Sequence, residues 1–196
     1  MSLAVESKDV LRDQVRQSLK RVPGTLDRAR LLYFDRPSYA LSGKHENEFD
    51  IKRAVAARYG IPFRSVVFAG SSQLGFSAVK DTSFEIGRSD LDVACIDAKL
   101  YMEFWQIVVS STRSFQDEYK FSKPEHMVKM KDHILRRGMI LLDFLPRCAR
   151  RTAEMAFQDE LRAQYRHIFG RVSIAVYMNE SSFCWKQSQS INAVMG

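Results

Sequence analysis

Two short stretches carry the residue types that could do chemistry together. Gly70-Ser71-Ser72 directly follows an apolar run, and Asp90-Leu91-Asp92 opens a second apolar run. In a β-strand, residues two apart point to the same face, so Asp90 and Asp92 are predicted to lie side by side while Leu91 faces the core. Carboxylates held this close repel each other, and a divalent cation removes the conflict. Magnesium is commonly bound by one or two carboxylates together with substrate phosphates. The pair therefore predicts a magnesium site.

The Gly-Ser turn supplies the complementary half of such a site. Glycine lets the backbone approach a phosphate closely. A helix that begins at the serines would direct free N–H groups and the positive end of its dipole at the anion. Each stretch alone also has an ordinary explanation, because Gly-Ser-Ser is common in turns and helix caps and Asp-x-Asp is common at solvated strand edges. The two together, in this order and after an apolar strand, favour a site for a metal-bound triphosphate.

Gly70-Ser71-x-x-x-Gly75 followed by Ser89-Asp90-Leu91-Asp92-Val93 resembles the signature of the nucleotidyltransferase-fold superfamily, the DNA polymerase beta-like group. The resemblance is to its minimal members and to the bacterial defence and second-messenger nucleotidyltransferases. It implies that Gly70, Ser71, Ser72 and Gly75 hold the phosphates of a nucleoside triphosphate such as ATP, and that Asp90 and Asp92 bind two Mg²⁺ ions. It implies transfer of a nucleoside monophosphate to a hydroxyl of RNA, of another nucleotide or of a protein. The motif covers only Val66–Ile96, and the insert Phe76–Arg88 is longer than compact members have.

The resemblance also implies a third catalytic carboxylate on a later strand. The predicted strand Arg171–Met178 contains no acidic residue. Glu180, just past its end, is the first candidate for the third catalytic acid, and Asp143 is the second. If neither faces the aspartate pair, the chain keeps the fold but serves as a binding or regulatory module, in a defence or toxin–antitoxin setting.

The overall composition suits a polyanionic partner. The chain has 196 residues, a formal net charge of +7 and a sequence pI of about 9.4. A basic nucleic-acid-binding domain is therefore a third interpretation. The three cysteines lie far apart, show no metal-ligand spacing and are expected to be reduced thiols in a cytoplasmic protein. No apolar run is long enough to span a bilayer, so no membrane partner is expected.

The hydrophobic pattern predicts an α+β fold, a small mixed β-sheet flanked by helices, in one domain over residues 1–196 with helical elements at both ends. Segment Met139–Pro146 is either a short strand carrying Asp143 or a turn, and Thr25–Ser42 is not assigned. Ser122-x-x-Glu125 predicts a capping box, and Ser181 is expected to be the N-cap of the last helix. The expected strands are Phe63–Ala69, Leu91–Ile96 and Arg171–Met178. The expected helices are Ser7–Lys20, Asn47–Tyr59, Ala98–Val109, Ser122–Arg137, Arg147–Phe169 and Ser181–Val194.

Overall fold

A mixed four-stranded sheet forms the centre of the protein in the computed structural model, which describes residues 7–196. The strand order is β1-β4-β6-β5, in which β4 is antiparallel to β1 and parallel to β6, and β5 is antiparallel to β6. The α+β prediction of a small mixed sheet flanked by helices is confirmed. The strands are β1 (Val66–Ala69), β4 (Asp90–Ile96), β5 (Met139–Leu141) and β6 (Arg171–Tyr177).

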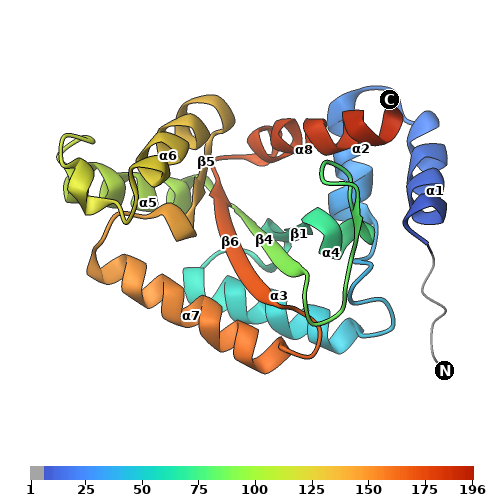
Figure 1. The fold of residues 1–196 in the computed structure, drawn as a ribbon, viewed down its shortest axis with the longest axis horizontal. Helices are drawn as coiled ribbons and strands as arrows, with labels where there is room; N and C mark the ends of the chain where they lie inside the picture. Colours follow the sequence, from blue (N-terminus) through green and yellow to red (C-terminus); the bar gives the residue numbers. More distant parts are fainter. Residues whose placement is uncertain (1–6) are drawn as a thin grey trace.

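Helices cover both faces of this sheet, as Figure 1 shows. Alternation along β4 sends Leu91 and Val93 into one hydrophobic cluster and Ala94 into the other. The Leu91 face packs against α3 (His45–Tyr59), α5 (Ala98–Thr112), α6 (Pro124–Arg137) and α7 (Ala149–Tyr165). The opposite face, to which Asp90 and Asp92 also belong by the same alternation, is covered by α1 (Lys8–Lys20), α2 (Thr25–Arg30), α4 (Gly70–Leu74) and α8 (Glu180–Met195).

Local capping signals set several helix ends. The Ser7 hydroxyl accepts from Val10 N and starts α1, and the Asp97 carboxylate accepts from Leu100 N at 2.8 Å and starts α5. Gly60 ends α3 in a left-handed conformation, φ +63°.

Two predicted caps are wrong. The N-cap of α6 is Lys123, because the Ser122 hydroxyl lies 2.9 Å from the His126 ring instead of capping the backbone. The N-cap of α8 is Asn179, whose side-chain oxygen accepts from Ser182 N at 2.8 Å, so the helix begins before Ser181.

The segments without an assignment also have definite structure. The connector forms α2 and a π-helical turn, Leu31–Asp35, and the Gln73 amide fixes this turn to α4 by donating to Leu32 O and Arg36 O, both at 2.8 Å. The insert forms a hairpin of β2 (Phe76–Ser77) and β3 (Thr82–Ser83). Segment Met139–Pro146 is a short strand, β5, followed by a turn, and Asp143 lies in the turn rather than in the strand. Short 3-10 turns occupy Phe63–Ser65, Glu118–Lys120 and Leu142–Phe144.

Candidate functional site

The Gly-Ser turn and the second aspartate lie side by side. Ala69 at the end of β1 pairs with Asp92 in β4, so the chain leaves the sheet at Gly70 directly beside the Asp92 side chain. Gly70 has φ +67°, and a Cβ placed on it would overlap Asp92 Oδ2. Only glycine combines this backbone conformation with so close an approach to the carboxylate.

A cavity of about 260 Å³ opens over this point of the sheet. Its floor is formed by residues of β4, β5 and β6, and its walls come from α6 and α8. The lining residues that carry polar side chains are Asp92, His133, Ser173, Tyr177, Lys186, Gln187 and Ser190. Of the predicted site residues, Gly70 and Asp92 both line this cavity, so it is the candidate site.

The surroundings of Asp92 disfavour the ionised form of its carboxylate. Its side chain is exposed to solvent within the cavity, yet protein atoms surround it on the other sides. This enclosure, followed by the charge of Asp90, raises the pKa of Asp92 from 3.8 to about 6, while Lys186, Lys80 and Arg171 act in the opposite direction. A bound cation would counteract this effect and lower the pKa of Asp92, because a nearby positive charge favours the ionised form of both carboxylates.

Positive side chains approach the acidic pair from three elements. Lys80 comes from the β2–β3 hairpin, Arg171 begins β6 opposite Asp90, and Lys186 comes from α8. Lys186 makes no hydrogen bond or ion pair with any residue of 7–196, and burial, followed by the charge of Arg137, lowers its pKa. A partly buried ammonium group without a fixed partner is suited to bind an anion such as a phosphate.

Of the four small residues predicted to hold phosphates, only Gly70 lines the cavity. Ser71, the next residue, is half-buried and is not among the lining residues. Ser72 is fully buried, with its hydroxyl donating to Ala69 O at 2.9 Å and its carbonyl accepting from Ser38 Oγ at 2.9 Å. Gly75 ends α4 with φ +87°, and a Cβ there would meet the Leu11 side chain at 2.7 Å. Ser72 and Gly75 therefore shape the turn and its packing rather than facing the cavity.

The structure does not bring Glu180 to the aspartate pair. Glu180 is exposed at the N-terminus of α8 and pairs with Arg30 Nε at 2.7 Å. Asp92 lies beside Ser173 near the start of β6. The strand ends at Tyr177, about 13 Å from Ser173 at ~3.3 Å per residue, and Glu180 lies beyond that end.

Asp143, the second candidate, lies nearer to the pair. Its Oδ2 accepts from Ser173 Oγ at 3.1 Å and pairs with Arg171 Nη2 at 2.5 Å. Ser173 therefore occupies the strand position beside Asp92. The Asp143 carboxylate does not reach this position itself but is hydrogen-bonded to Ser173. Across residues 7–196, no three His, Cys, Asp or Glu side chains are grouped closely enough to hold a metal ion. The donor set that fits Mg²⁺ is Asp90 and Asp92, with the remaining ligands left to substrate phosphate and water.

Three residues of the site escaped the sequence prediction. Nothing in the sequence around Lys186 indicates a role in the site, because only the tertiary packing of α8 places this residue at the cavity. Alternation places Arg171 and Ser173 on one face of their strand, but only the parallel pairing of β4 with β6 places them beside Asp90 and Asp92.

Comparisons with protein-family models, with curated proteins and with solved structures find no match for this chain. The case for a function therefore rests on the geometry of the residues themselves. In the part of the chain that the structure describes, no helix has both the length and the apolar character that crossing a bilayer requires. The three cysteines, Cys95, Cys148 and Cys184, are free.

Proposed function

We propose that this protein is a magnesium-dependent nucleotidyltransferase that moves a nucleoside monophosphate from a nucleoside triphosphate to a hydroxyl group. The observation that carries the proposal is the contact between Gly70 and the Asp92 carboxylate, beside a second carboxylate on the same strand face. This juxtaposition joins the two halves of the motif, which are separated in sequence by a whole hairpin.

The residues present fit the requirements of a metal-bound triphosphate. Asp90 and Asp92 would hold Mg²⁺, which when bound neutralises phosphate charge and orients the attacking and leaving oxygens. Gly70 leaves room for a phosphate at the turn, and Lys186 and Lys80 supply positive charge to the triphosphate. In the reaction, the acceptor hydroxyl oxygen forms a bond to the α-phosphorus, the bond to the β-phosphate oxygen breaks, pyrophosphate leaves, and the hydroxyl proton passes to water. The protein contributes position and charge rather than covalent chemistry.

A second candidate is a nucleotide-binding module without turnover. It is favoured by one observation, the presence of Ser173 where a third carboxylate would stand beside Asp92. Such a protein would bind a magnesium–triphosphate complex through the same residues and serve a regulatory role in a cytoplasmic defence or toxin–antitoxin setting.

Calorimetric titration with Mg²⁺ and each nucleoside triphosphate, followed by a pyrophosphate-release assay, tests both candidates. We expect binding by the wild type and its loss in Asp90→Asn/Asp92→Asn. Glu180→Gln is the matched control, because it removes a carboxylate outside the cavity and should leave binding unchanged. Pyrophosphate release identifies the enzyme, and binding without release identifies the module. Salt-sensitive binding of nucleic acid alone, unaffected by the double substitution, would reject both and leave the basic nucleic-acid-binding domain.

A further inference from the structure

A second and larger cavity adjoins the candidate site. It has a volume of about 500 Å³ and lies between the C-terminal end of α6 and the first half of α8. Lys186 lines both cavities, and the consecutive residues Gly138 and Met139 line the larger and the smaller one, respectively. The two cavities are therefore adjoining parts of one surface around α8.

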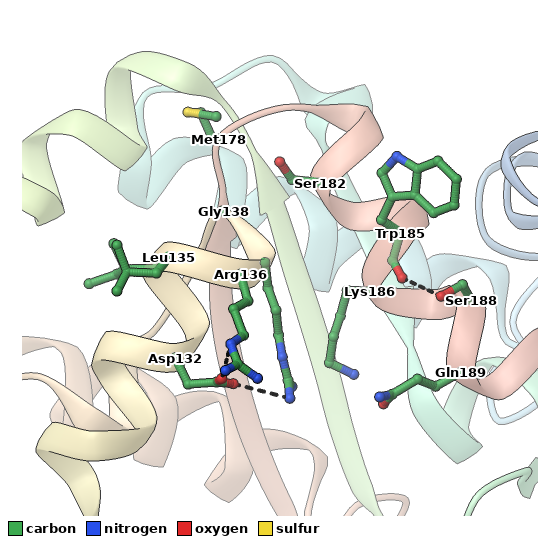
Figure 2. A pocket seen from close by; sticks show the side chains of 12 residues that line it. Asp132, Leu135, Arg136, Gly138, Met178, Ser182, Trp185, Lys186, Ser188 and Gln189 are labelled. Carbon is green, nitrogen blue, oxygen red and sulfur yellow. Dashed lines mark hydrogen bonds and ion pairs between the residues drawn. The ribbon is translucent and has the colours of Figure 1, made fainter.

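The larger cavity carries an excess of positive charge. Arg136, Arg137 and Lys186 line it, and the acidic residue among its lining side chains is Asp132, which pairs with both arginines at 3.3 Å. Figure 2 shows Arg136 on the α6 wall and Lys186 directed into the space from the α8 wall. Burial, followed by the positive charge of Arg137, lowers the pKa of Lys186, so these two cations repel one another across the cavity. An anion in the cavity would relieve this repulsion.

Exposed apolar side chains stand around the same cavity. Trp185 is 59% exposed and Leu135 is 81% exposed, although both are large and hydrophobic. Figure 2 shows the Trp185 ring at the rim of the cavity, on the side of α8 opposite to the direction in which Lys186 extends, and Leu135 extending outward from α6. An exposed aromatic ring beside a groove of arginine and lysine is the combination by which proteins bind nucleotides of a single strand, with the base stacked on the ring and the phosphate on the cations.

We propose that this cavity holds the acceptor of the transfer reaction as a nucleotide unit, with its base against Trp185 and its phosphate between Arg137 and Lys186. The assignment of this ligand as acceptor rests on the proposed function, whereas the binding itself does not. The nucleotide unit is supplied either by the end of a single-stranded nucleic acid or by a free mononucleotide. The shared residue Lys186 places the bound acceptor next to the aspartate cavity.

Trp185 provides a direct reporter, because the chain contains only two tryptophans. The other, Trp105, is half-buried against Phe115, so Trp105→Phe leaves Trp185 as the sole emitter at little structural cost. This variant would be titrated with a single-stranded oligoribonucleotide of about ten nucleotides and, separately, with a mononucleotide. We expect quenching of Trp185 on binding. A tighter, salt-dependent response to the strand identifies a nucleic-acid end as the ligand, and equal responses identify the mononucleotide.

Arg137→Gln in the same background should weaken binding about tenfold, as expected for loss of one charge-assisted phosphate contact. The matched control is Arg53→Gln, which removes the same charge from an exposed position of α3 and should leave binding unchanged. No quenching by either probe, or equal weakening by Arg137→Gln and Arg53→Gln, would overturn the proposal.

The Asp90→Asn/Asp92→Asn protein separates this inference from the proposed function. We expect it to retain the Trp185 response although it binds no magnesium–triphosphate. A wild type that shows the Trp185 response but neither binds nor turns over triphosphates would refute the proposed function and leave the nucleotide cavity in place. Loss of the Trp185 response in the double variant would show that the probes bind at the aspartates, and would overturn the inference.

Discussion

Replacement of Gly70 by alanine tests the contact on which the candidate site rests. Two costs are expected. The left-handed conformation at φ +67° costs an alanine about 1–2 kcal/mol. The added methyl group would also overlap Asp92 Oδ2, and because that atom ends a short side chain, the carboxylate can turn aside for about 1 kcal/mol of rotamer strain. We expect Gly70→Ala to lower the free energy of unfolding by about 2–3 kcal/mol.

Gly60→Ala provides the matched control. Gly60 has nearly the same backbone conformation, φ +63°, but no atom lies within 4 Å of the position that its Cβ would take. Gly60→Ala should therefore lower the free energy of unfolding only by the conformational cost of about 1–2 kcal/mol. Asp92→Ala provides the second control, because it removes the carboxylate that the new methyl group would overlap. The remaining Cβ of residue 92 lies at an ordinary contact distance of 3.6 Å from that methyl group. In that background Gly70→Ala should cost no more than Gly60→Ala.

Urea denaturation of the wild type and the variants measures these differences. The expected coupling between positions 70 and 92 is about 1 kcal/mol, well within the range found for side chains in contact. Calorimetry adds a functional readout, since the carboxylate turned aside in Gly70→Ala should lose magnesium–triphosphate while Gly60→Ala retains it. Equal destabilisation by the two alanines, undiminished by Asp92→Ala, would show that the turn and the carboxylate are not in contact and would remove the basis of the site.

Three further predictions follow from individual side chains. Glu154 is fully buried and is bound by Tyr59, Arg58 and Arg150. Glu154→Ala should therefore lower the free energy of unfolding, measured by urea denaturation, by about 3–5 kcal/mol. A loss below about 1 kcal/mol would contradict a stabilising role of these buried contacts. Glu180→Ala should cost less than about 1 kcal/mol by the same measurement, because its ion pair with Arg30 is exposed; a larger loss would assign it a structural role. Asp92 has a pKa of about 6 in the folded protein and 3.8 as its ordinary value, so between these pH values the folded state holds a proton that the unfolded chain has released. Its contribution makes the free energy of unfolding fall as the pH rises from about 4 to about 6, by about 1 kcal/mol after allowance for solvent at the side chain, and Asp92→Asn should remove that part of the slope. An unchanged slope in Asp92→Asn would refute the pKa shift.

Local chemistry made much of the framework predictable from the sequence. The alternation of apolar residues after Asp90, and along Arg171–Tyr177, marks strands whose side-chain period is two. Gly60 and Asp97 fix helix ends through their own backbone and carboxylate, so these boundaries are encoded within a few residues. The common face of Asp90 and Asp92 follows from the same period and needs no tertiary information.

Tertiary pairing decided which residues share the cavity. The parallel register of β4 with β6 sets Ser173, rather than an acid, beside Asp92, and β5 brings Asp143 within one hydrogen bond of that serine. Glu180 was a reasonable sequence candidate because it follows the same strand, but it lies beyond the strand end opposite to the one that meets the aspartates. Lys186 enters only because α8 folds back over the sheet. Periodicity reports which face of an element is apolar, whereas register and packing direction depend on contacts between residues far apart in the chain, and these contacts set the chemistry of the site.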